Sequence, residues 1–139
     1  YPGMRTLCFA FDGSDDNIHH PKNLVSNLVY YTGTHDNDTI RSFIEQMDEN
    51  SLANAKRCLH FDRREDAVQA FVKGCLDSVC DTAMLPMQDV LNLGNEARMN
   101  LPGTIGGNWI WRMLPGAATP EIAAWLRGLN QESGRLPDQ

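Results

Sequence analysis

The stretch LVYYTGTHDNDT, residues 28–39, decides the fold predicted for this chain. Its first four residues form a continuous apolar run, which is typical of a strand covered on both faces. Apolar residues then recur at the spacing of one helix face, at Ile40, Phe43, Ile44 and Met47. Asp38 or Thr39 occupies the position of the helix N-cap. The polar residues therefore lie in a strand-to-helix loop, the place where α/β proteins bind ligands.

Two further segments are predicted to be strands of the same sheet. Residues 4–11, MRTLCFAF, form the first strand and are followed by a polar loop over residues 12–23. Residues 82–87, TAMLPM, form a short apolar run that ends as a strand near Pro86. The chain opens in what reads as a buried strand, without a leader sequence, so we expect a domain that belongs to something larger.

Helical patterns fill the space between these strands. A helix over residues 40–47 is followed by one that Ser51 can cap and that runs to Leu59. A third covers residues 62–79, with an apolar stripe made by Ala67, Ala70, Phe71, Gly74, Cys75 and Val79.

The C-terminal third combines a long loop with one clear helix. Residues 88–113 have no sustained period, so we expect an ordered loop, and loops of this length are usually functional. A helix follows, capped by Thr119 and with Pro120 at its first position. Its apolar face consists of Ile122, Trp125, Leu126 and Leu129. Strands that alternate with helices predict parallel βα units, as part of a barrel or of a doubly wound sheet.

Composition narrows the classes of function. The chain has 139 residues, of which 42% are hydrophobic and 22% charged, as in ordinary globular domains. The net charge of −6 argues against a nucleic-acid partner, because phosphate binding requires a basic surface. No apolar run approaches the roughly 20 residues that span a bilayer, so no membrane role is expected. The cysteines, Cys8, Cys58, Cys75 and Cys80, lack metal-site spacing, and we expect free thiols in a reducing cytoplasm rather than two disulfides.

The pair His35–Asp36 is the main candidate for chemistry. A carboxylate can stabilise a developing positive charge, and an imidazole beside it can donate a hydrogen bond to a polar substrate that carries hydroxyls. Helix capping alone would explain one acidic residue here, but the loop holds more polar residues than capping needs. A divalent-metal site, formed by His35, Asp36 and Asp38 with residues 15–20, is a weaker alternative.

The glycine-rich stretch GTIGGNW, residues 103–109, is the second candidate. It lacks the lysine of a phosphate-binding loop, so its glycines more readily serve close approach or positive φ. Trp109 and Trp111 are two residues apart, so one can be in the core while the other stacks on a sugar ring. Asn108 offers an amide donor and acceptor for a hydroxyl.

Long motifs throughout the chain closely resemble the C-terminal part of the 4-α-glucanotransferases. This is the amylomaltase or disproportionating-enzyme family, a branch of the α-amylase superfamily. The matching segments are YPGMRTLCFAF (1–11), YTGTHDNDT (31–39), LPMQDVLNLG (85–94) and ARMNLPGTIGGNWIWR (97–112). They occur in the expected order and cover essentially the whole chain.

The resemblance implies an α/β fold, namely about strands 6–8 with their helices of a (β/α)8 TIM barrel. Residues 1–139 would be the C-terminal portion of the catalytic domain. Its substrates would be α-1,4-glucans and maltooligosaccharides, processed with retention through a glycosyl-enzyme and passed to a glucan 4-hydroxyl. Asp36 would be the transition-state-stabilising carboxylate, and His35 and Asn108 would bind substrate. Neither a cofactor nor a metal is implied.

The family's nucleophile and acid/base lie on earlier strands, so this portion alone is expected to be inactive. Asp89 is the nearest second acid, and we expect it to order the loop that follows it. The open sheet edges predict self-association. Two other classes of function are less well supported: a carbohydrate-binding module that uses His35, Trp109 and Trp111, and a structural domain with an incidental acidic loop.

Overall fold

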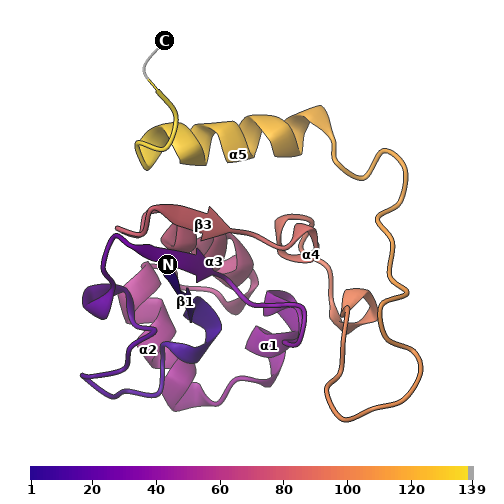
Figure 1. Ribbon diagram of the computed structural model, residues 1–139, viewed down its shortest axis with the longest axis horizontal. Coiled ribbons are helices and arrows are strands. Elements are labelled where there is room, and N and C mark those ends of the chain that lie inside the picture. The colour runs from indigo at the N-terminus through magenta and orange to yellow at the C-terminus, as the bar shows by residue number, and fades with distance from the viewer. Residues whose placement is uncertain (138–139) are drawn as a thin grey trace.

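Three parallel strands form one sheet in the computed structural model, which describes residues 1–137 (Figure 1). The strands are β1 (Gly3–Thr6), β2 (Leu28–Tyr31) and β3 (Thr82–Met84), in that spatial order. Both pairings are parallel: Met4 lies opposite Val29 in the first, and Val29 lies opposite Thr82 in the second. The expectation of parallel βα units is confirmed.

The first strand is shorter than its apolar run predicted. β1 ends at Thr6, and residues Leu7–Phe9 form a 3₁₀ turn in place of the strand expected up to residue 11. The Cys8 amide donates to the Thr32 carbonyl over 3.1 Å, which holds this turn against the end of β2. Leu7, Cys8, Ala10 and Phe11 are nevertheless all buried. Their hydrophobicity therefore reflects the core and not an extended backbone.

Two helices follow β2. Helix α1 (Ile40–Gln46) begins after Thr39, whose hydroxyl accepts from the Ser42 amide. Its predicted apolar face is confirmed, with Ile40 and Ile44 buried and Phe43 and Met47 packed against the core. Helix α2 (Glu49–Leu59) is capped by Asp48 and not by Ser51 as expected, because the Asp48 carboxylate accepts from the Ser51 amide over 2.9 Å.

Helix α3 (Ala67–Leu76) lies at the centre of the core. A 3₁₀ turn, Arg64–Asp66, precedes it, so it is shorter than the predicted range of 62–79. Phe71 and Cys75 are fully buried, and the Phe71 ring meets Phe11 edge-on with centroids 5.5 Å apart. Val79, expected on the same face, is 63% exposed because it lies beyond the end of the helix.

The expected loop 88–113 contains two short helical turns. Helix α4 (Met87–Val90) follows β3 directly, and a 3₁₀ turn spans Asn95–Ala97. Within the described chain, residues 98–119 then run without helix or strand to α5 (Pro120–Glu132), as Figure 1 shows in orange and yellow. Thr119 caps α5 as predicted, accepting from the Ile122 amide. The apolar face of α5 is half-buried, in contact with α3.

Arg135 binds the residues after α5 to the end of α3 and to the turn before β3. Its guanidinium donates to the carbonyls of Leu76 (2.6 Å), Ser78 (3.0 Å) and Cys80 (2.9 Å). These carbonyls lie at the end of α3 and in the turn before β3. One side chain thus satisfies several acceptors that the helix and turn leave open.

Replacing Arg135 by Ala is expected to loosen α5 without unfolding the core. Hydrogen bonds from a charged donor contribute roughly 1.5–3 kcal/mol, so the local free energy of opening falls by about that amount. Hydrogen exchange followed by mass spectrometry should show faster exchange in α5 and unchanged exchange in α3. Arg127→Ala, on an exposed position of the same helix, is the matched control. Equal protection of α5 in both variants would contradict the assignment.

The sheet leaves one face and two edges open. Among residues 1–137 the outer edges of β1 and β3 pair with no further strand. Met4 and Met84, on the face away from the helices, are 49% and 47% exposed. The expected self-association through these edges stays a prediction. Over the same residues, no helix has the length and apolar character needed to cross a membrane.

The cysteines are free thiols, three of them buried. Burial raises the pKa of Cys8 and of Cys75 to about 12, so both thiols stay protonated at neutral pH. They therefore act as small apolar side chains in the core.

Candidate active site

The loop between β2 and α1 carries His35 and Asp36 and is shaped by its own polar side chains. Asn37 Oδ1 accepts from the Thr34 amide over 2.8 Å and from the Thr34 hydroxyl over 3.0 Å. The Asp36 amide in turn donates to the Thr34 hydroxyl over 3.3 Å. These hydrogen bonds fix the conformation of the loop, which lies at the C-terminal end of the sheet as predicted from the sequence.

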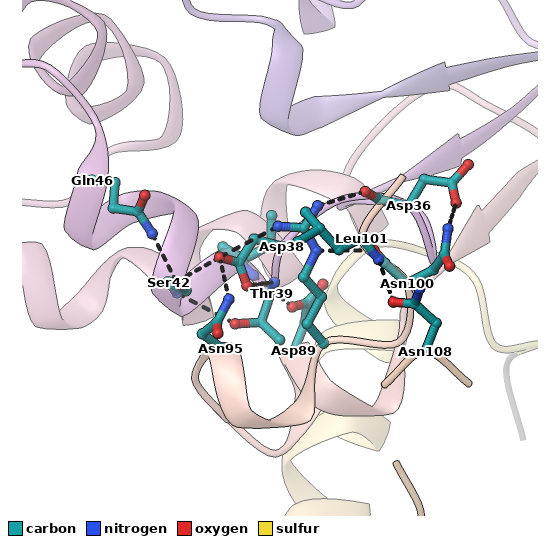
Figure 2. A network of polar contacts seen from close by, with 12 residues as sticks. Asp36, Asp38, Thr39, Ser42, Gln46, Asp89, Asn95, Asn100, Leu101 and Asn108 are labelled. Atoms are coloured by element: carbon teal, nitrogen blue, oxygen red, sulfur yellow. Dashed lines mark hydrogen bonds and ion pairs between the residues drawn. The ribbon is translucent and has the colours of Figure 1, made fainter. Parts of the chain in front are cut away.

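Asp89 anchors both ends of this loop from beneath (Figure 2). Its Oδ2 accepts from the Thr32 hydroxyl at the end of β2 over 2.6 Å. Its Oδ1 accepts from the Ile40 amide at the start of α1 over 2.8 Å. Asp89 is 3% exposed, and burial raises the pKa of its carboxyl above the ordinary value. The expectation that Asp89 orders the loop following it is wrong, because these contacts fix the β2–α1 loop.

Asp38 has a structural role in the same network. Its Oδ1 accepts from the Thr39 amide, and its Oδ2 accepts from Ser42 Oγ (2.7 Å) and Asn95 Nδ2 (2.9 Å). Asp38 is therefore not the N-cap of α1, which is Thr39, but it binds the first turn of that helix through the Ser42 hydroxyl. The capping interpretation does not hold for Asp36 either: over the described residues 1–137, its carboxylate accepts a hydrogen bond from Asn100 and none from α1.

Asp36 lies at the rim with its side chain 51% exposed. Its Oδ1 accepts from Asn100 Nδ2 over 2.7 Å and is 3.4 Å from His35 Nε2. The carboxylate is thus held by the neighbouring segment yet accessible from solvent. This combination allows a negative charge to face a bound ligand.

The loop separates two hollows. His35 lines a cavity of about 410 Å³, together with Tyr31, Met84 and Trp109. Asp36 lines the second, of about 620 Å³. His35 and Asp36 thus line two neighbouring hollows, of which the one beside His35 is the more apolar.

Trp109 lies against His35, with ring centroids 5.0 Å apart. Its φ is 64°, in the left-handed region that bulky residues rarely adopt. The Trp109 amide donates to the Met99 carbonyl over 2.7 Å, which fixes this conformation. Strained backbone of this kind clusters at functional sites. Of the two tryptophans for which core and stacking roles were both open, Trp109 lines the cavity and Trp111 is half-buried.

Asn108 lies outside both hollows and organises its own loop. Its Oδ1 accepts from the Leu101 amide over 2.9 Å, and its Nδ2 donates to Thr104 Oγ1 over 2.9 Å. The structure therefore brings His35 and Asp36 together and places Asn108 on the adjacent loop. Among residues 1–137, no group of three or more His, Cys, Asp or Glu side chains is arranged to hold a metal ion.

The sequence model of the 4-alpha-glucanotransferases matches residues 1–118. The chain belongs to this family. The chloroplastic/amyloplastic 4-alpha-glucanotransferase of Arabidopsis thaliana is 42% identical over 99% of the chain, which spans 23% of that relative. The 4-alpha-glucanotransferase of Thermus thermophilus is 42% identical over 97% of the chain, which spans 28% of it.

A solved structure extends the likeness to three dimensions. The amylomaltase from Streptococcus agalactiae, in complex with acarbose, superposes with a TM-score of 0.91 at 31% identity. The match covers 96% of the present chain and 27% of that amylomaltase. The chain therefore spans about a quarter of the length of the relatives it matches.

Sequence reasoning missed two residues at this candidate site. Asn100 binds the Asp36 carboxylate, and Arg98 Nη2 donates to the Asp36 carbonyl over 2.9 Å. Both lie in the segment that was expected only to be an ordered loop. Their positions follow no helical or strand period, so the family motif at residues 97–112 was the only signal that marked them.

Proposed function

We propose that the chain is the C-terminal portion of the catalytic domain of a retaining 4-α-glucanotransferase. In this proposal residues 1–139 supply strands six, seven and eight of a (β/α)8 barrel, with β2 as the seventh. The parallel order of the strands and the likeness to amylomaltase support this assignment. The polar loop at the C-terminal end of β2 supports it too, because barrel enzymes place their catalytic groups there.

The proposed reaction transfers a segment of an α-1,4-glucan to the 4-hydroxyl of glucose or of another glucan. A carboxylate nucleophile forms a glycosyl-enzyme, and a second carboxyl serves as acid and then as base. A retaining mechanism places these two groups roughly 5 Å apart across the bond. Asp89 is buried and committed to two hydrogen bonds, so it does not fit either role. The nucleophile and the acid/base are therefore assigned to the preceding part of the barrel.

Asp36 is assigned the third carboxylate role. The observation that carries this assignment is an exposed carboxylate at the rim of β2, fixed through one oxygen. A sugar ring that acquires oxocarbenium character gains positive charge, which a preorganised carboxylate stabilises more strongly than water does. His35 would donate to a hydroxyl of the reacting sugar, and Trp109 supports its ring.

The proposed ligands are α-1,4-glucans and maltooligosaccharides. The cavity beside His35 combines the apolar faces of Trp109 and Tyr31 with polar groups, a composition that suits a pyranose ring. Asn108 is proposed to contact substrate from the adjacent loop, in addition to ordering that loop. The cytoplasm is the proposed compartment, on the basis of the free thiols.

Maltotriose distinguishes the catalytic role from simple sugar binding. The chain alone and a full-length 4-α-glucanotransferase that carries it are incubated separately with maltotriose. Glucose and longer maltooligosaccharides should appear only with the full-length enzyme, because the chain alone lacks the nucleophile and the acid/base. Chromatography of the products gives the readout. Transfer by the chain alone would overturn the proposed division of catalytic groups, whereas saturable maltotriose binding without turnover would fit it.

A further inference from the structure

We propose that Asn100 is a positioning residue that sets the orientation of the Asp36 carboxylate. It holds one oxygen of Asp36 and leaves the other free to face the substrate. The inference rests on the proposed function, because it assumes that Asp36 stabilises the transition state. It adds a residue to that site which acts through Asp36 and not on the sugar.

The contacts between the two segments form a short ladder (Figure 2). Asn100 Nδ2 donates to Asp36 Oδ1 over 2.7 Å, and the Asn100 amide donates to the His35 carbonyl over 3.1 Å. Arg98 completes the ladder by donating to the carbonyls of Asp36 and Asn100, each over 2.9 Å. The side chain of Asn100 is therefore placed by backbone bonds that its own substitution leaves intact.

The two oxygens of Asp36 have different surroundings. Oδ1 accepts from Asn100 and is 3.4 Å from His35 Nε2. Among residues 1–137, no group donates a hydrogen bond to Oδ2. Figure 2 shows this second oxygen pointing away from Asn100. The carboxylate plane is thus fixed at one oxygen, and the other remains available.

An amide suits this role better than a cation does. A half-exposed carboxylate rotates freely unless a neighbour fixes it, and a freely rotating group must be ordered during the reaction. A lysine or arginine at position 100 would also fix Asp36, but it would offset the negative charge that the sugar cation needs. The neutral donor of Asn100 orients the carboxylate and preserves its charge.

The test uses the full-length enzyme that carries this segment, with maltotriose as substrate. Asn100→Ala should lower kcat by about 10- to 100-fold, the effect of losing a hydrogen bond to a charged group, with KM changed less than about twofold. Asn100→Asp should lower kcat at least as far, because it replaces the donor by a second carboxylate. Asn100→Gln, which retains a donor, should recover part of the rate. Asn50→Ala, at an exposed position on α2, is the control.

A double substitution separates the two proposals. In an Asp36→Ala background, Asn100→Ala should add less than a twofold loss, since its effect acts through Asp36. If Asn100 instead contacts the sugar, KM rises and Asn100→Asp is tolerated, which overturns the inference.

If Asp36→Ala is inactive while Asn100→Ala is fully active, the inference fails and the proposed function stands. If Asp36→Ala is itself fully active, the proposed function fails. Should Asn100→Ala not fold, the kcat values of Asn100→Asp and Asn100→Gln are compared: a higher value for Asn100→Gln supports the inference, and an equal or lower value overturns it.

Discussion

Replacing Asp36 by Asn in the full-length enzyme is expected to lower kcat by at least about 100- to 1,000-fold. Asn has the same shape, so the change removes the negative charge and little else. Loss of one preorganised electrostatic contact to a transition state typically costs this much. KM for maltotriose should change far less, because the uncharged ground-state sugar has little need of the carboxylate. Initial rates of glucose release over a range of maltotriose concentrations provide both constants.

A second carboxylate provides the matched control for this result. Asp62 is exposed after the C-terminal end of α2 and lines neither hollow, so Asp62→Asn should leave kcat near that of the unmodified enzyme. Circular dichroism must show that both variants fold. An Asp36→Asn variant that is folded and retains more than about a third of the rate would remove Asp36 from the mechanism.

Replacing Asp89 by Ala is expected to have the largest effect on stability, a loss of about 3 kcal/mol in the free energy of unfolding. The substitution leaves the Thr32 hydroxyl and the Ile40 amide buried without their acceptor. Each unsatisfied buried group costs roughly 1–3 kcal/mol. Urea unfolding of the 139-residue chain, followed by tryptophan fluorescence, measures the difference.

The Asp89→Asn variant tests the same site through its pH dependence. Burial raises the pKa of Asp89 in the folded chain above the ordinary value of 3.8, so the folded state favours the protonated form. The stability that this proton contributes is fully present below the unfolded pKa and is lost as pH rises through the folded pKa. An uncharged Asn can accept from Ile40 and donate to Thr32. The stability of Asp89→Asn relative to the unmodified chain should therefore increase as pH rises from about 4.

Two outcomes would contradict this account of Asp89. Equal stability of Asp89→Ala and the unmodified chain would mean that the hydrogen bonds contribute nothing. A difference between Asp89→Asn and the unmodified chain that stays constant with pH would mean that the carboxyl is not desolvated. Thr32→Val, which removes one of the two donors, should fall between Asp89→Asn and Asp89→Ala in stability.

The fold was predictable wherever local pattern and tertiary environment agree. The period of α1, its cap at Thr39 and the run of β2 were each readable from a few neighbouring residues. Prediction was wrong at residues 7–11, where a buried 3₁₀ turn has the hydrophobicity of a strand. Nothing local distinguishes the two, because burial and not extension selects those residues.

The site was predictable as a location but not as a network. His35 and Asp36 belong to a group of polar residues that follows a buried strand, a pattern that indicates a candidate site. Their supports, Asp89 and Asn100, come from segments that pack against the loop only after folding. No periodicity links residues that interact across such distances in the chain, so the sequence alone does not predict these partners.

The anchoring of the β2–α1 loop by later residues also bears on the order of assembly. Asp89 reaches back 57 residues to Thr32, and Asn100 reaches back 64 residues to Asp36. Contacts between residues so far apart along the chain cost more loop-closure entropy than local contacts do, so we expect them to form later. During synthesis on the ribosome, the β2–α1 loop can therefore reach its final conformation only after the segment beyond β3 has been made. Until then this loop is a polar turn without the hydrogen bonds that fix its geometry.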